Sequence, residues 1–97
     1  MVAMSRTVRD SMEETREYHL RYLRAVSNPV RRSILRALRG GEMSFEKLLS
    51  TTGLEEKILR WHLEVLEAGF CVEKRERDGT LYYNLTKEGK VIEYIEE

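Results

Sequence analysis

The 97-residue chain has the size of one small domain and carries 17 basic and 17 acidic residues, so its formal net charge is zero. Apolar residues make up 41% and charged residues 35%, which is typical of a water-soluble, helix-rich protein. No apolar run has membrane-spanning length, no signal peptide is recognisable, and a single cysteine, Cys71, excludes an internal disulfide. We therefore expect one domain over residues 1–97, a cytoplasmic location and no contact with a membrane.

The zero net charge hides an uneven distribution. Residues 1–54 hold ten basic and six acidic residues, a balance of +4, whereas residues 55–97 hold seven and eleven, a balance of −4. Proteins that bind nucleic acid usually carry a basic excess, because phosphate contacts supply much of their affinity. Overall neutrality therefore argues against nucleic-acid binding, while the basic N-terminal half favours it.

Residues 7–26 contain neither Gly nor Pro and predict a long helix. One set of positions in it repeats with the 4-3-4-3-4 spacing of a seam between two helices. These positions are Val8, Met12, Thr15, His19, Tyr22 and Val26. The seam either packs on the chain's own domain or pairs with a second copy. Its first half is long and weakly hydrophobic for a monomer core, which favours the dimer.

A second helix is predicted to begin at Asn28-Pro29, because Asn is a good N-cap and Pro is favourable at the first helical position. Gly40-Gly41 ends it. Arginines follow its outward face at Arg32, Arg36 and Arg39, with Arg31 beside them. This stripe is either a solvated face with salt bridges or, at Arg32 near the start of the helix, a contact to phosphate.

Residues 44–69 predict a helix-turn-helix, with Ser44 as the first N-cap, Gly53 in the turn and a second helix over about 55–68. Apolar residues recur at i, i+3 and i+4 in both helices and predict inward faces. Leu54 is expected to be the buried residue of the turn. The second helix of such a motif can lie in the major groove of DNA.

The outer face of residues 55–68 holds two candidates for contacts to bases or phosphates, Lys57 and Arg60, and a candidate for contact with a thymine methyl group or a sugar, Trp61. The alternatives are an ion pair between Arg60 and Glu56, and packing of Trp61 against neighbouring elements. The carboxylates of Glu55 and Glu56 repel phosphate and argue against base readout at these two positions.

Residues 70–85 predict a β-hairpin closed by Asp78-Gly79, a two-residue turn signal. Lys74, Arg75 and Arg77 give it positive charge, which favours contact with a flanking groove of DNA. Nearby acids dilute that charge, so a solvated hairpin is the alternative. Residues 86–96 then predict a last helix, weakened by a glycine in its first turn.

No motif for catalysis is present: the chain lacks a glycine-rich phosphate loop, a nucleophile elbow and a set of residues with metal-ligand spacing. Cys71 is expected to be a buried small hydrophobe and His62 a structural residue. We therefore expect neither an enzyme nor a bound cofactor or metal.

Three stretches resemble the ArsR-like winged helix-turn-helix regulators of bacteria and archaea, over about residues 23–90. They are SNPVRRSILRALRGG, FEKLLSTTGLEEKILRWHLEVLEAG with the Phe70-Cys71-Val72 that follows it, and RERDGTLYYNLT. The resemblance implies a mainly α fold with a small β-hairpin wing (α+β). Its expected order is helix, helix, short strand, helix, helix, two strands, helix.

The same resemblance implies a homodimer that pairs through its first and last helices, which adds Val91 and Ile95 to the seam. Metal-sensing members carry a cysteine pair before the recognition helix, where this chain has Leu48-Leu49-Ser50. No metal effector is therefore expected.

We therefore expect a transcriptional regulator that binds double-stranded DNA sequence-specifically as a homodimer. Residues 55–68 would lie in the major groove and the wing, residues 74–80, near the flanking groove. The alternative is a winged-helix module that binds protein, with weak or no DNA binding, which the zero net charge and Glu55-Glu56 favour.

Overall fold

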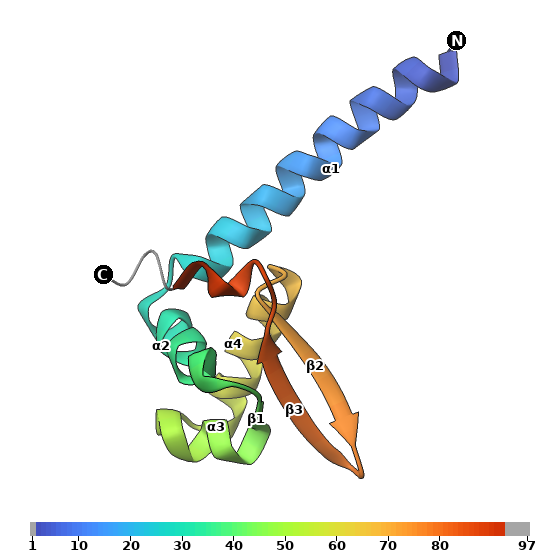
Figure 1. The fold of residues 1–97 in the computed structure, drawn as a ribbon. Helices are drawn as coiled ribbons and strands as arrows, with labels where there is room; N and C mark the ends of the chain where they lie inside the picture. Colours follow the sequence, from blue (N-terminus) through green and yellow to red (C-terminus); the bar gives the residue numbers. More distant parts are fainter. Residues whose placement is uncertain (1, 93–97) are drawn as a thin grey trace.

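Residues 2–92 are described in a computed structural model of the chain, with side chains described from residue 14 onward (Figure 1). The elements in chain order are α1 (Val2–Val26), α2 (Pro29–Ala37), the 3₁₀ helix η1 (Leu38–Gly40), β1 (Met43–Ser44), α3 (Phe45–Thr52), α4 (Glu56–Ala68), β2 (Val72–Arg77), β3 (Thr80–Leu85) and the 3₁₀ helix η2 (Gly89–Val91). This order confirms the predicted winged helix-turn-helix. Helix α1 and the β2–β3 hairpin both project from the body formed by the other elements. No helix of the described part is long and apolar enough to cross a membrane.

The three strands form one antiparallel sheet in the order β1-β3-β2. The hairpin turns at Asp78 and Gly79, which both have positive φ, 52° and 79°. Asp-Gly tolerates this conformation, and its twist matches that of the flanking strands. The predicted hairpin is therefore confirmed, although β2 begins at Val72 rather than at residue 70.

The core lies between α2, α3, α4 and the sheet. Helix α4 contributes Leu59, Leu63 and Leu66, all fully buried as their spacing predicts. The other large, fully buried side chains are Ile34, Leu35, Leu38, Leu48, Cys71 and Ile92. Leu54 departs from its prediction, because it is only half-buried at the edge of this core.

Both ends of the chain differ from the sequence prediction. Helix α1 begins at Val2 rather than near residue 7, consistent with the absence of Gly and Pro from that stretch. The predicted last helix over 86–96 is, within the described residues, a turn followed by η2. The hydroxyl of Thr86 caps it by accepting the N–H of Gly89 at 3.0 Å. Residues 93–97 lie outside the described part.

Two glycines are required by close approach of other elements. Gly69 ends α4 with a φ of −90°, and the next residue, Phe70, is left-handed, with φ 64°. A Cβ on Gly69 would lie 2.5 Å from the Cβ of Ala25, where α1 crosses the end of α4. A Cβ on Gly89 would lie 2.0 Å from the carbonyl oxygen of Cys71. Gly89 therefore lets η2 contact the start of the hairpin.

Replacing Gly89 by alanine should lower the free energy of unfolding by about 2 kcal/mol, because backbone atoms must move to admit the new methyl group. Urea unfolding followed by circular dichroism measures this change. Gly40→Ala is the matched control, since a Cβ there meets nothing within 4 Å. Equal stabilities of the two variants would contradict the close-approach explanation.

Candidate nucleic-acid interface

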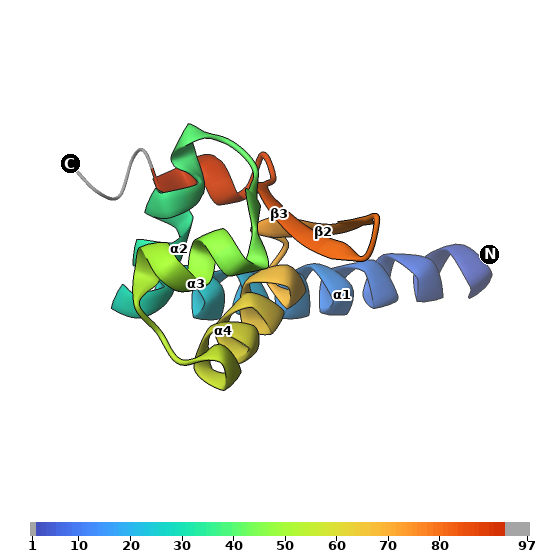
Figure 2. The same ribbon diagram turned by 90° about the horizontal axis from the view of Figure 1, so that it is seen from below.

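Helices α3 and α4 are joined by a short turn (Figure 2), and local hydrogen bonds fix this unit. Ser44 caps α3, its hydroxyl accepting the N–H of Lys47 at 3.1 Å. Gly53 ends the helix in the left-handed conformation, with φ 70°, and its N–H donates to the carbonyl of Leu49. Because the apolar side of α4 is buried in the core, the opposite side of the helix faces solvent.

On the outer face of α4, Lys57 and Arg60 differ in whether they form an ion pair. Lys57 is exposed and makes no ion pair with any described residue. Arg60 donates to Glu56 at 2.8 Å, as its spacing predicts, and its guanidinium lies 5.0 Å from the ring centre of Phe45. The Arg60–Glu56 pair is exposed on both sides, and such pairs contribute only about 0.3–0.5 kcal/mol. Arg60 can therefore exchange its partner at little cost.

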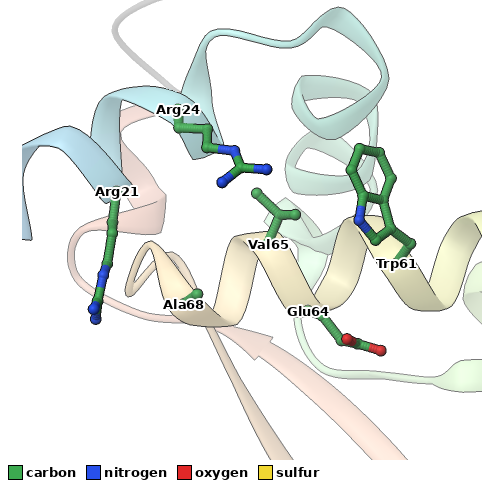
Figure 3. A pocket seen from close by; sticks show the side chains of 6 residues that line it. All are labelled: Arg21, Arg24, Trp61, Glu64, Val65 and Ala68. Atoms are coloured by element: carbon green, nitrogen blue, oxygen red, sulfur yellow. The ribbon is translucent and has the colours of Figure 1, made fainter.

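Trp61 is 51% exposed, and its indole has contacts with residues of α4 and α2. Its ring lies 4.8 Å from that of His62 and 5.7 Å from the guanidinium carbon of Arg31, which belongs to α2. Figure 3 shows the indole at one end of a groove of about 170 Å³ between α1 and α4. The other residues that line this groove are Arg21, Arg24, Glu64, Val65 and Ala68. One part of the indole is thus fixed and the rest faces solvent.

The three basic residues of the wing are exposed, and each has an acidic partner. Lys74 lies 3.9 Å from Glu67, and Arg75 lies 3.3 Å from Glu73. The third, Arg77, pairs with Glu42 and lies 4.2 Å above the ring of Tyr82. The Glu42 partner raises the pKa of Arg77, so its charge is retained at any physiological pH. Each cation of the wing is therefore paired with a carboxylate, and the wing is not a purely basic surface.

The prediction that the arginines of the second helix all lie on or beside an outward face is partly wrong. Arg36 and Arg39 are exposed, but Arg31 is buried, with only 5% of its surface exposed. Arg32 is half-buried, and its Nε donates to the carbonyl of Val26 at 2.7 Å. Arg32 is therefore held against the end of α1, and only part of its guanidinium remains for another partner.

Sequence reasoning missed the inward position of Arg31, although a signal was present. Arg31 lies at i relative to Ile34, Leu35 and Leu38 at i+3, i+4 and i+7, the spacing of one helix face. Its donors bind the carbonyls of Arg24 and Ala25 and face Nδ1 of His62. His62 is 6% exposed, consistent with the structural role predicted for it.

The predicted dimer seam is only partly exposed. Thr15 and His19 are exposed, whereas Tyr22 is half-buried against the chain's own core, where burial raises its pKa. Val91 is likewise half-buried against that core. The side chains of Val8 and Met12, and all of Ile95, lie outside the described residues.

Two leucines beside the seam are exposed although the prediction did not include them. Leu20 is 56% and Leu23 45% exposed on the free side of α1. Their signal in the sequence was the widening of the apolar stripe near the end of the helix. Because they are three positions apart, the two leucines lie on the same side of this projecting helix.

The described residues contain no group of three or more His, Cys, Asp or Glu that could hold a metal ion. Cys71 is fully buried, and burial followed by the nearby Glu88 raises the pKa of its thiol to about 11. The thiolate is therefore scarce at neutral pH, as expected of a cysteine that serves as a small hydrophobe.

Comparison with known proteins relates the chain to bacterial regulators. The family described as "Helix-turn-helix domain" matches residues 26–75. The structure of NolR from Sinorhizobium fredii is 30% identical with a TM-score of 0.73, covering 88% of this chain and 87% of that one. The transcriptional repressor BigR from Xylella fastidiosa is 28% identical with a TM-score of 0.71, covering 90% and 91%.

A third structure is the homodimeric winged helix-turn-helix DNA-binding domain Mb0332 from Mycobacterium bovis, described as a possible ArsR-family transcriptional regulator. It is 25% identical with a TM-score of 0.80, covering 90% of this chain and 82% of that one. A search of curated proteins found no significant match. From the matched helix-turn-helix segment, the winged fold and these likenesses, the chain belongs to the ArsR-like family of winged helix-turn-helix transcriptional regulators.

Proposed function

We propose that the chain is a transcriptional regulator that binds double-stranded DNA sequence-specifically as a homodimer. In this proposal α4 is the recognition helix in the major groove, and the β2–β3 wing lies near the flanking groove. The observation that carries it is the outer face of α4, where exposed Lys57 has no ion-pair partner among the described residues and Trp61 stands beside it. The opposite side of the same helix is fully buried, so the helix presents this face rigidly.

Each basic residue of this surface has a role that fits its position. Lys57 contacts a base edge or a phosphate directly, and Arg60 does so after leaving Glu56. The exposed part of Trp61 contacts a thymine methyl group or a sugar. Backbone phosphates are bound by Lys74, Arg75 and Arg77 of the wing and by Arg32 at the start of α2.

The acidic partners of these cations do not exclude the proposed phosphate contacts. Exposed ion pairs contribute about 0.2–1 kcal/mol each, so DNA phosphates can displace the carboxylates of Glu56, Glu67 and Glu73. Phosphate contacts also release counterions from DNA, which gives them their salt dependence. Zero net charge is therefore compatible with a local binding surface.

The homodimer is proposed to form along α1, the helix that projects from the body (Figure 1). Exposed His19, Leu20 and Leu23 supply a surface that a second copy covers. The proposed contact also includes Thr15, Tyr22 and Val91, together with three seam residues whose side chains lie outside the described part, Val8, Met12 and Ile95. Two copies would place their α4 helices on successive major grooves of a near-palindromic site. The homodimeric state of the relative Mb0332 supports a homodimer of this chain.

A second candidate function is a protein-binding module, which the pairing of nearly every interface cation with an acid favours. In that case exposed Ile58 and Trp61 on α4 would contact a protein rather than DNA. The two functions differ in their response to salt and to loss of the α4 cations.

Titration against DNA from upstream of the chain's own coding sequence should show binding that weakens steeply as salt rises. If the dimer neutralises about eight phosphates, log K should fall against log salt with a slope of roughly −7, measured by fluorescence anisotropy. Absence of binding at low salt, or a flat salt response, would contradict the proposed function.

Replacing Lys57 and Arg60 together by alanine should weaken DNA binding at least about tenfold without unfolding the protein, because both side chains are exposed. The matched control removes two exposed lysines outside α4 and the wing, Lys87→Ala with Lys90→Ala, and should bind nearly as the wild type. If the α4 variant keeps its DNA affinity but loses a protein partner of the wild type, the second candidate function is supported instead.

Leu23→Glu should shift the protein toward monomers, because it places a charge in the proposed contact along α1. Sedimentation equilibrium measures the shift, and DNA affinity should fall with it since each monomer contacts only a half-site. Lys47→Glu, an equally exposed change on α3, should leave the oligomeric state unaltered. A dimer that withstands Leu23→Glu would show that this part of α1 lies outside the interface.

A further inference from the structure

A buried arginine joins three helices, α1, α2 and α4. Arg31 of α2 donates through Nε to the carbonyl of Ala25 at 3.1 Å and through Nη2 to the carbonyl of Arg24 at 2.9 Å. Both carbonyls belong to the last turn of α1, which lacks helical partners for its final C=O groups. The third nitrogen, Nη1, lies 3.3 Å from Nδ1 of His62 on α4.

The chemistry of this contact fixes the protonation state of His62. A guanidinium has only donors, so Nδ1 of His62 must act as an acceptor and carry no proton. The ring is then neutral, with its proton on Nε2. Burial, and after it the charge of Arg31, lowers the pKa of His62 below its ordinary value of 6.5. Burial and Arg24 in turn lower the pKa of Arg31.

The charged groups that act on this pair come from α1 and α2 and are all cationic. Arg24 of α1 acts on Arg31, and Arg31 of α2 acts on His62; no carboxylate of the described residues contributes to either shift. Protonation of His62 would thus place two cationic donors face to face in a buried site. The carboxylate of Glu64 lines the neighbouring groove with Arg24 but contributes to neither shift, so the two cations would repel each other and the contact would be lost.

Loss of the contact between Arg31 and His62 would affect the outer face of α4, because both side chains lie against Trp61. The guanidinium carbon of Arg31 lies 5.7 Å from the centre of the indole, and the imidazole of His62 lies 4.8 Å from it. Half of the indole is exposed at the proposed DNA-facing surface. A change at Arg31 or His62 therefore alters the position of a side chain expected to contact DNA.

We propose that Arg31 positions the recognition helix α4 relative to the end of α1, and that it does so only while His62 is neutral. Acidification then loosens α4 from the helix that carries the proposed dimer contact. The effect on DNA rests on the proposed function, whereas the contact itself does not. Arg31 thus supplies a proton-sensitive link between the dimer helix and the DNA-facing surface.

Trp61 is the only tryptophan of the chain, so its fluorescence reports on this link without a label. The emission of the wild type should change as the pH is lowered below 6.5, with the helical circular dichroism retained. Because the unfolded chain protonates His62 more readily than the native state does, stability should also fall as pH decreases through this range. DNA affinity should fall about tenfold over the same range.

Variants separate this link from other titrations. His62→Asn supplies a non-titrating acceptor near the position of Nδ1 and should abolish the fluorescence transition. His19→Asn removes the other histidine, which is exposed on α1, and should retain it. Arg31→Lys should weaken DNA binding about tenfold, because the three donors of an ammonium share one nitrogen and cannot span acceptors that the guanidinium reaches from three separate nitrogens. Arg32→Lys, which loses a bond to the same end of α1 but none to α4, should keep the transition.

Nitrogen NMR of the wild type provides a test that needs no variant, since it reads the tautomer of each histidine directly. A proton on Nδ1 of His62 at neutral pH, or a fluorescence transition that persists in a folded His62→Asn variant, would overturn the proposal. A transition that depends on His62 in a protein that binds no DNA would support the link and contradict the proposed function. DNA binding without any such transition would support the proposed function and contradict the link.

Discussion

The arrangement of the molecule depends on the junction where α1 ends against α2 and α4. Two arginines of α2 bind the last carbonyls of α1, Arg31 those of Arg24 and Ala25 and Arg32 that of Val26. On the other side Gly69 admits Ala25 to the end of α4, where any side chain would collide. This junction sets the angle at which α1 leaves the body (Figure 1) and places the end of α1 beside the groove-lining residues of α4 (Figure 3). The proposed dimer contact and the proposed DNA contact therefore share one anchor.

The basic residues of the chain divide by burial into two kinds. Arg31 and Arg32 are committed to backbone carbonyls inside the molecule and stabilise the junction. Arg60 and the wing cations are exposed in weak ion pairs that phosphate can displace. Counting charge along the sequence cannot separate these kinds, which explains why net charge is a poor guide to the function of this chain.

Much of the candidate site could be predicted from local sequence. The exposed position of Lys57, the Glu56–Arg60 pair and the hairpin turn all follow from spacing within a few residues. The spacing of α2 also places Arg31 on the buried face of the helix. The prediction missed this position because a charged side chain is usually exposed. Its partners lie on α1 and α4, and no local pattern shows that their carbonyls and imidazole converge.

The sequence by itself determined the order of the elements, their caps and their apolar faces, because these depend on interactions between residues three or four positions apart. Tertiary structure alone decided why Gly69 and Gly89 are glycines, since the atoms that would meet a Cβ belong to Ala25 and Cys71. It also decided that Tyr22 faces the chain's own core while Leu20 and Leu23 do not. The side of α1 that is free depends on how the helix crosses α4, and the packing of the two helices fixes that crossing.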